Sequence, residues 1–293
     1  MSVEQISVEK TSTRAAICII GDEILNGKTK DSNTNYLARF CFDLGVDLKR
    51  VEVIPDDEAD IKETVRRLSD RFDLVFTSGG IGPTHDDITY GSIAAAYNLP
   101  LALDNKTCED MVRLSVQRDP KWDLTNARKR MATFPSPATI LRPVPELWVP
   151  VVVVNGNIHI LPGIPRLFEQ LLQGLKPHIL SVKQKKLEAA GFSGEGQVGY
   201  ARYYRSQVGT SLPEGAIADA LTDIQAKVKS RDIKVGSYPK WGGVSDAQGR
   251  QVRVVVSVVG RDEAGVKEVA DEIRQAVDGW EVTGLDEDAK GKM

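Results

Sequence analysis

The sequence predicts an α/β protein, with a parallel β-sheet that carries helices on both faces, followed by a smaller α+β domain. In the first part, short apolar segments alternate with segments whose apolar residues recur at helical spacing. Strands joined through helices run parallel, because a helical crossover returns the chain to the same end of the sheet. In the second part, after residue 182, the composition changes and this alternation stops.

Three strands open the first domain, predicted at 15–20, 48–54 and 72–77. A helix is predicted after each of them, at 34–45, 56–71 and 89–98. The first strand, AAICII, is a continuous apolar run, as is typical of a strand covered on both faces. The first helix ends at Gly45, and the second begins with acids and ends with bases, as the helix dipole favours.

The middle of the chain is less regular. Two further helices are predicted, at 108–118 and 124–132. The proline-rich segment 135–150 is predicted to be a loop with short extended pieces. The segment 151–161 is predicted to form a hairpin, because two apolar strands flank Asn155-Gly156, a dipeptide favoured in tight turns. Pro165 is then expected to open a helix.

Beyond the first domain, residues 183–197 are charged and contain glycines, which indicates a linker or an exposed hairpin. The pattern then predicts the order strand, helix, strand, strand, helix, at 198–206, 213–228, 233–238, 251–259 and 262–277. Residues 238–243, YPKWGG, are expected to lie in a turn. The chain is therefore divided into a disordered N-terminus, a first domain, a second domain and a disordered tail, at 1–13, 14–182, 183–284 and 285–293.

Composition and charge exclude several classes of function. The 293 residues carry a net charge of -3 at pH 7, so no overall basic charge favours a nucleic-acid partner. Apolar runs such as 149–154 are far too short to cross a membrane. Three widely spaced cysteines, and an N-terminus without signal-peptide features, indicate a cytoplasmic protein. Cys18 lies in an apolar strand and is interpreted as a core residue rather than a nucleophile.

The loop after the third strand, SGGIGPTHDDIT at 78–89, is the most informative segment of the chain. A buried strand that leads through a glycine-rich turn into a helix is a ready anion site, because free backbone N–H groups and the helix dipole converge there. Glycines also let the backbone turn sharply and approach a ligand closely. Phosphate binding is therefore predicted for Ser78, Gly79, Gly80, Gly82, Pro83 and Thr84.

Carboxylates stand beside this predicted phosphate site. Asp86 and Asp87 would repel phosphate unless a divalent cation lay between them, which predicts a metal-assisted phosphate ester or anhydride site. Gly21, Asp22 and Glu23 come directly after the first strand, and ligands of parallel sheets bind at the carboxyl ends of the strands. The predicted ion is Mg²⁺, Mn²⁺ or Co²⁺. Its predicted ligands are Asp22, Glu23, Asp86 and Asp87.

Two of these residue types also have a plainer interpretation. An aspartate at a helix start is usually a cap, and one of Asp86 and Asp87 is expected to be one. His85 is either a general acid or base of the reaction or a structural hydrogen-bond partner of the loop. As a catalytic set, the sequence gives Asp86, Asp87 and His85.

Other candidate contacts lie outside the two loops. Gly163, in the turn PGIP at 162–165, either lines the same site or belongs to a simple sharp turn. Tyr238 and Trp241 either stack on a ligand ring or pack at a core edge. Asparagines of the first loop region are expected to add at most neutral polar contacts: Asn26, Asn33 and Asn35.

Three segments together, at 21–45, 78–89 and 160–169, resemble the molybdopterin-binding-type domain of the CinA family. The THDDIT spelling and GSYPKWG at 236–242 are more similar to the N-terminal domain of eukaryotic FAD synthases and to stand-alone fungal FAD pyrophosphatases. The resemblance implies a molybdopterin-binding-like fold and a nucleotide pyrophosphatase that hydrolyses FAD to FMN and AMP, with ADP-ribose and related dinucleotides as candidate further substrates. It further implies a divalent cation and K⁺ as an activator. The chain is also expected to form a homo-oligomer, either a dimer or a trimer.

The molybdenum cofactor proteins that share this type of domain use it to hold a pterin, so the fold alone does not decide the chemistry. The alternative function is therefore a non-catalytic binder of molybdopterin or of a nucleotide, or a molybdenum cofactor assembly factor. A third is a scaffold in which the α/β domain only mediates dimerisation. Incubation with FAD and a divalent metal, followed by separation of FMN and AMP, distinguishes these functions.

Overall fold

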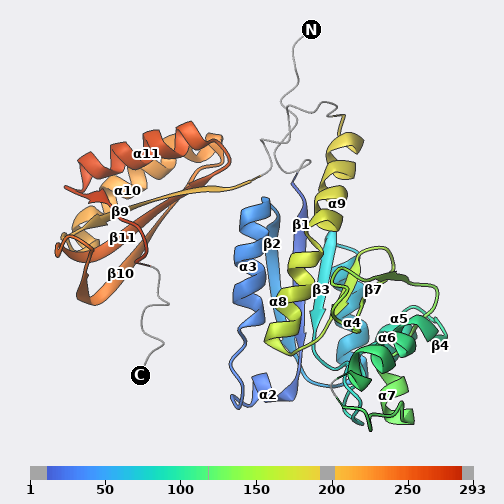
Figure 1. The fold of residues 1–293 in the computed structure, drawn as a ribbon. Coiled ribbons are helices and arrows are strands. Elements are labelled where there is room, and N and C mark those ends of the chain that lie inside the picture. Colours follow the sequence, from blue (N-terminus) through green and yellow to red (C-terminus); the bar gives the residue numbers. More distant parts are fainter. Residues whose placement is uncertain (1–11, 118, 192–201, 286–293) are drawn as a thin grey trace. The chain divides into compact units, whose positions relative to one another are not determined.

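The computed structural model describes residues 12–117, 119–191 and 202–285. The chain forms two compact units, Met1–Gly194 and Glu195–Met293 (Figure 1). Disorder was predicted at 1–13 and 285–293, of which residues 1–11 and 286–293 lie outside the described residues, as does the end of the predicted linker at 192–197. Ser12 and Thr13 are described and buried, so the predicted disorder was wrong there.

A six-stranded sheet forms the centre of the first unit, in the order β2-β1-β3-β8-β7-β6. Its strands are β1 (Arg14–Ile20), β2 (Asp47–Ile54), β3 (Leu74–Ser78), β6 (Thr139–Leu141), β7 (Val151–Val154) and β8 (Ile158–Leu161). Every pair in this sheet is parallel except the two pairs made by β7. The predicted α/β fold is confirmed, and its antiparallel strand comes from the predicted hairpin, where Asn155 and Gly156 both have positive φ.

Helices cover both faces of this sheet (Figure 1). They are α3 (Asn33–Leu44), α4 (Glu58–Ser69), α5 (Thr89–Ala96), α8 (Pro165–Gly174) and α9 (Lys176–Ala189), whereas the four-residue α2 (Asp22–Leu25) follows β1 and buries no residue. Since β2 and β3 flank β1 on opposite sides, right-handed crossovers place α3 on one face and α4 on the other. α3 packs against α8, and α4 packs against α5. The core between the layers is apolar and includes the fully buried Leu37, Phe76 and Phe168.

The ends of these helices follow local signals. α3 is followed by Gly45 in the left-handed conformation, with φ 63°, and α8 begins at Pro165, as predicted. α4 begins at Glu58, because the Asp57 side chain accepts hydrogen bonds from the first turn and caps it. The prediction that this helix begins at residue 56 was therefore wrong, and Asp56 stands in the loop that follows β2.

A small lobe lies between α5 and β6 in the sequence. It consists of β4 (Leu101–Leu103), α6 (Asn105–Val116), α7 (Asn126–Arg130) and β5 (Thr133–Pro135). β4 pairs with β5, and β5 contacts α5. A separate apolar cluster around Cys108, Met111 and Ala132 holds the lobe together. The two predicted helices are present as α6 and α7, and β6 is a short extended piece within the proline-rich segment, as predicted. β5 lies almost wholly before that segment.

The charged residues from 183 onward are helical as far as Ala189, so the predicted linker or hairpin was wrong there. α9 continues past residue 183 because residues on one of its faces are buried against the rest of the first unit. Ile179 is buried, and the equally buried Lys183 donates from Nζ to the carbonyl oxygen of Leu44 at the end of α3. A lysine that caps another helix has the same sequence signature as one in solvent, which is why composition alone misplaced this helix.

The second unit is an antiparallel sheet with two helices. The sheet order is β10-β11-β9-β12. Its elements are β9 (Tyr204–Thr210), α10 (Glu214–Val228), a 3₁₀ turn at Lys229–Arg231, β10 (Lys234–Ser245), β11 (Gln251–Gly260), α11 (Glu263–Ala276) and β12 (Trp280–Glu281). The predicted order of strands and helices is confirmed, with β12 added at the end, while the start of the predicted first strand, 198–201, lies outside the described residues.

Residues 238–243 lie within β10, not in a turn, so that prediction was wrong. The register to β11 shifts between Pro239 and Val244, and Gly242 and Gly243 adopt positive φ in the bulge. β10 is an edge strand, where a proline is tolerated because one of its sides has no partner strand. The chain reverses only after Ser245, at residues 246–249.

Two histidines connect β8 with α9 in the first unit. His159 is fully buried, and its Nδ1 lies 2.9 Å from the carbonyl oxygen of Asn157, to which it donates. The other ring nitrogen, Nε2, lies 3.0 Å from Nε2 of His178 and accepts a hydrogen bond from it. Burial, together with the charge of His178, lowers the pKa of His159 to about 4.

This depressed pKa predicts a loss of stability in mild acid. Between the unfolded-state pKa near 6.5 and the folded-state value of about 4, the unfolded chain binds the extra proton. The free energy of unfolding should therefore be fully present above pH 6.5 and fall by about 3 kcal/mol by pH 4 through this group alone. In denaturant titrations at several pH values, His159→Gln should lose less stability on acidification than the parent does; equal losses would contradict the assignment.

Candidate functional site

The loops that follow β1, β2, β3 and β8 meet at one end of the sheet. The amide of Gly21, after β1, donates to the carbonyl oxygen of Ile54 in β2 at 3.1 Å. The amide of Gly79, after β3, donates to the carbonyl oxygen of Leu161 in β8 at 3.3 Å. The two predicted loops, at 21–27 and 79–87, therefore leave adjacent strands at their carboxyl ends.

Gly79 and Gly80 make the turn out of β3. Gly79 has φ 113°, and a Cβ built there would lie 2.1 Å from the carbonyl oxygen of Ile20. Thr89, the first residue of α5, holds the turn from the other side: its Oγ1 donates to Gly79 O at 2.9 Å and its amide to Gly80 O at 3.0 Å. Because glycine has no Cβ, the backbone of this loop can approach the end of β1 closely, and no other residue would fit at position 79.

The PGIP turn joins the same site. A Cβ at Gly163 would lie 3.3 Å from the Cα atom of Gly79, so the two loops are in backbone contact. Asn33, the buried first residue of α3, bridges them: its Nδ2 donates to Ser78 Oγ at 2.9 Å and to the carbonyl oxygen of Gly163 at 2.8 Å. Asn33 therefore fixes the relative positions of the two loops, which is more than the neutral polar contact expected of it. The other two candidate asparagines, Asn26 and Asn35, are exposed.

Asp87 shapes the glycine loop. Its Oδ1 accepts from the amide of Gly82 at 2.6 Å, and its Oδ2 accepts from the amide and Oγ1 of Thr84 at 2.8 and 2.6 Å. These three bonds turn the carboxylate into the loop. The amides of Gly82 and Thr84, two residues expected to bind phosphate, therefore already donate to Asp87.

Neither aspartate caps α5, so the predicted capping role was wrong. The residue before the helix is Ile88, and the first amide of the helix donates to Gly80 O instead. The amides of Gly80 and Ile81 make no hydrogen bond to any described residue, which leaves them for a ligand.

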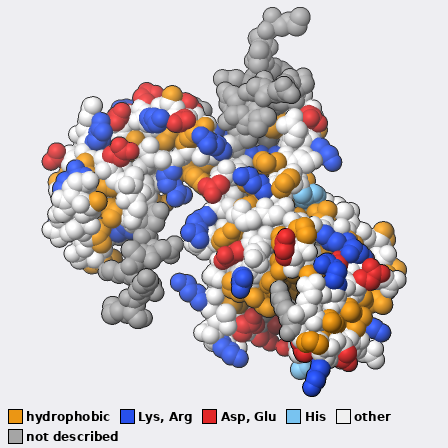
Figure 2. All heavy atoms as spheres, in the orientation of Figure 1, with side chains coloured by type: hydrophobic (Ala, Val, Ile, Leu, Met, Phe, Trp, Pro, Cys, Tyr) orange, Lys and Arg blue, Asp and Glu red, His pale blue; other side chains and the backbone are white. Residues whose placement is uncertain are grey.

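Four carboxylates gather around the loop ends. Asp22 and Glu23 in α2 and Asp86 in the glycine loop are exposed, and Asp56, after β2, is half-buried. Asp56 Oδ2 accepts from the amide of Asp22 at 3.1 Å. Figure 2 shows Asp and Glu side chains gathered at the lower end of the first unit, where Figure 1 places α2.

The environment separates the pKa values of two of these carboxylates. Burial raises the pKa of Asp56, and the negative charges of Asp22, Glu23 and Asp86 raise it further. Hydrogen bonding within the glycine loop lowers the pKa of Asp86. Asp86 therefore stays ionised while Asp56 binds a proton more readily, which is the arrangement typical of a base beside a fixed charge. Sequence reasoning missed Asp56, although it follows a parallel strand just as Asp22 does.

The carboxylates do not form a ready-made metal cage. Among the described residues, no group of three or more His, Cys, Asp or Glu side chains is arranged to hold a metal ion. Mg²⁺, however, is usually held by one or two carboxylates together with substrate phosphates and waters. The exposed oxygens of Asp22, Glu23 and Asp86 fit an ion that arrives with such a substrate, and Asp87, turned into the loop, fits less well.

The remaining predicted residues are placed as follows. Gly21 is buried under the carboxylate of Glu23, and Pro83, Thr84 and His85 are exposed on the loop. The His85 ring makes no hydrogen bond to any described residue, so the alternative of a structural partner for the loop gains no support. Tyr238 and Trp241 belong to the second unit and are 56% and 94% exposed. Trp241 is therefore not packed at a core edge, and the predicted ring stacking of both residues remains a prediction.

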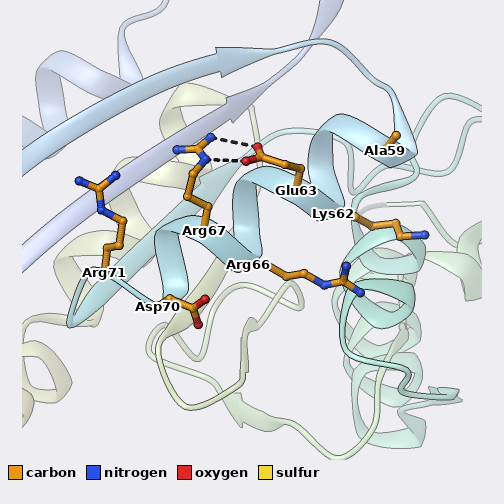
Figure 3. Close-up of a pocket in the computed structure, with 7 residues that line it drawn as sticks. All are labelled: Ala59, Lys62, Glu63, Arg66, Arg67, Asp70 and Arg71. Carbon is orange, nitrogen blue, oxygen red and sulfur yellow. Dashed lines mark hydrogen bonds and ion pairs between the residues drawn. The ribbon is translucent and has the colours of Figure 1, made fainter.

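A hollow on α4 contains none of these residues. It measures ≈ 580 Å³ and is lined by Ala59, Lys62, Glu63, Arg66, Arg67, Asp70 and Arg71 (Figure 3). Arg67 forms ion pairs with Glu63 and Glu52, so its charge is used within the fold. The hollow is therefore a feature of the helix surface and not the site built by the strand ends.

Comparison with known proteins assigns both parts of the chain. Residues 16–181 match the family described as probable molybdopterin binding domain, and residues 202–286 match the FAD synthase middle domain. A probable FAD synthase of Caenorhabditis elegans is 30% identical, over 77% of this chain and 44% of that protein. A CinA-like protein of Mycobacterium sp. (strain JLS) is 32% identical, over 75% of this chain and 52% of that protein.

The chain thus spans about half the length of the curated relatives it matches. The crystal structure of CinA from Thermoplasma acidophilum, a protein of unknown function, superposes with a TM-score of 0.50 at 31% identity, covering 58% of this chain and 99% of that one. Within the described part of the chain, no helix has the length and apolarity needed to cross a bilayer.

Proposed function

Because this chain belongs to the molybdopterin-binding-domain family, as the resemblance of its motifs predicted, we propose that the strand-end site binds the diphosphate of a nucleotide and hydrolyses it. The observation that carries the proposal is the meeting of four carboxylates with a glycine loop that has two unused amides. The match to the FAD synthase middle domain and the names of the relatives support FAD as the substrate, with FMN and AMP as products.

In this proposal each group of residues has a separate role. The amides of Gly80 and Ile81 hold a phosphate oxygen, since they have no partner among the described residues. Asp56, with its raised pKa, accepts the proton of the attacking water. Asp22, Glu23 and Asp86 hold the divalent cation, which supplies positive charge to the phosphates during the reaction. Asp87 and Thr89 keep the loop in shape.

The proposal is tested by incubating the purified chain with FAD and Mg²⁺, Mn²⁺ or Co²⁺ and separating FMN and AMP. Both products should appear in equal amounts. If FAD binds but stays intact, the chain is a nucleotide binder, and if only a molybdopterin binds, the alternative function stands. Absence of hydrolysis with all three metals would refute the proposed reaction.

Substitutions of Asp86 and Asp87 should separate chemistry from loop structure. Asp86 is exposed, so Asp86→Asn should leave the melting temperature nearly unchanged while turnover falls by about a hundredfold. Asp87 accepts three bonds from the loop, and an amide can accept only through its single oxygen. Asp87→Asn should therefore lower the free energy of unfolding by about 2 kcal/mol and reduce turnover as well.

Thermal denaturation and FAD turnover, measured on both variants, check this separation. An Asp86→Asn variant that hydrolyses FAD at nearly the parent rate would remove Asp86 from the reaction. An Asp87→Asn variant that is as stable as the parent would show that the three loop bonds are not formed in solution.

A further inference from the structure

Arg130, the last residue of α7, reaches the glycine loop from the small lobe. Its Nη2 donates to the carbonyl oxygen of Pro83, across 47 positions of sequence. Among the described residues it is the one cationic side chain that hydrogen-bonds to the loop 78–88. The lobe therefore brings a positive charge to the edge of a site whose other charged groups are mainly carboxylates.

The charge of Arg130 is not used elsewhere in the fold. Within the described residues it forms no ion pair, and its side chain is exposed. Its neighbour Arg128 is different: the guanidinium of Arg128 lies 4.5 Å from the centre of the Trp122 ring, and its Nη1 lies 3.0 Å from Asp123 Oδ1. A charge held at a loop without an acidic partner is available to an anionic ligand.

The position of Arg130 is fixed by the lobe. Thr125 caps the start of α7, and Thr133 Oγ1 donates to the carbonyl oxygen of Lys129 at 2.7 Å. β5 then pairs with β4 and contacts α5, the helix that the glycine loop enters. The backbone at Arg130 is therefore held by elements on both sides of it in the sequence, and the hydrogen bond to Pro83 places the guanidinium beside the loop.

We propose that Arg130 binds a phosphate oxygen of the substrate's diphosphate. The inference rests on the proposed function, because it names the group that recognises the diphosphate at the same site. A guanidinium has five N–H donors in a planar fork, and the Pro83 carbonyl occupies one of them. The remaining donors suit the paired oxygens of a phosphate. Arg130 thereby favours ligands with a diphosphate over nucleosides or monophosphates, which place less charge at the loop.

Binding of FAD and of inorganic pyrophosphate, measured by calorimetry with Mg²⁺ present, tests the inference. Arg130→Met, which keeps the apolar stem but removes the charge, should weaken both ligands about tenfold. Arg130→Lys should recover part of the loss, because the charge returns without the fork. Arg128→Met is the matched control on the same helix and should bind both ligands as the parent does.

A role limited to bracing the loop would give a different result. If Arg130 contacts phosphate, the dissociation constant of FAD should depend less on salt in Arg130→Met than in the parent, because one charge pair is lost. A brace alone would leave the salt dependence unchanged. Parent-like affinity in Arg130→Met, or an unchanged salt dependence, would therefore overturn the proposal.

These binding measurements do not require turnover. A parent chain that binds FAD without hydrolysing it refutes the proposed function, and the comparison of variants still decides the role of Arg130. A parent chain that hydrolyses FAD while Arg130→Met binds it equally well overturns only the role of Arg130. A parent chain that binds neither FAD nor pyrophosphate overturns both.

Discussion

Hydrolysis of FAD by this chain is expected to fall to background in excess EDTA and to return when Mg²⁺, Mn²⁺ or Co²⁺ is restored. Asp22, Glu23 and Asp86 crowd the half-buried Asp56, and their charges raise its pKa. A diphosphate brought to the same loop adds further negative charge, and like charges about 4 Å apart repel by about 1–4 kcal/mol at the dielectric constants of a protein surface. One guanidinium at Pro83 does not balance this charge, so a divalent cation is needed.

Product formation is followed with and without chelator, and thermal denaturation under the same conditions is the control. Because no preformed cage for a metal is found among the described residues, EDTA should leave the melting temperature of the ligand-free chain unchanged. Exchange of Na⁺ for K⁺ in the same assay tests the expected activation by potassium. Undiminished hydrolysis in excess EDTA would exclude a metal-assisted reaction.

Gly79→Ala is expected to lower the free energy of unfolding of the first unit by about 4 kcal/mol, from strain and overpacking that each cost about 1–3 kcal/mol. The φ of 113° is one that L-residues rarely adopt. The added Cβ would also lie 2.1 Å from Ile20 O, a backbone atom of the central strand that has no freedom to move away. The melting temperature should fall by roughly 10 °C.

Gly91→Ala is the matched control. Gly91 lies in α5, shortly after the glycine loop, and a Cβ there meets nothing within 4 Å. Alanine at an exposed helical position should stabilise the chain by about 0.5–1 kcal/mol. Urea denaturation of both variants checks the pair. A Gly79→Ala chain as stable as the Gly91→Ala chain would show that β1 and the loop do not approach each other this closely.

Much of the fold could be predicted because its signals are local. AAICII forms β1 because a continuous apolar run suits a strand covered on both faces, and Asn155-Gly156 forms the hairpin turn because both residues accept positive φ. The errors arose where a distant contact decided the structure. Lys183 is helical and buried because it reaches the end of α3. Pro239 lies in a strand because β10 is at an edge of its sheet.

In the candidate site, too, the residues with a local sequence signal could be predicted, and those that depend on distant contacts could not. The glycine loop and the carboxylates of the first loop could be found, because each comes directly after a strand. Asp56 was taken for part of a helix, although the rule that selects the carboxyl ends of strands applies to β2 as well. No sequence motif indicates that Arg130 lies beside the glycine loop, because its contact with Pro83 depends on how the small lobe folds. Asp87 was assigned to chemistry, and only the structure shows its three bonds within the loop.

The pairing of β3 with β8 determines when the site can form. β1, β2 and β3 follow one another closely in the chain, whereas β8 comes only after the whole small lobe and the hairpin. Closing so long a connection costs more chain entropy than pairing neighbouring strands, so β8 is expected to join the sheet late in folding. As the chain is synthesised from its N-terminus, the glycine loop emerges well before the strand and the PGIP turn that hold it in place. A nascent chain that ends before Leu161 thus carries every carboxylate of the site but lacks both the carbonyl oxygen that accepts from the Gly79 amide and the Gly163 backbone that contacts Gly79.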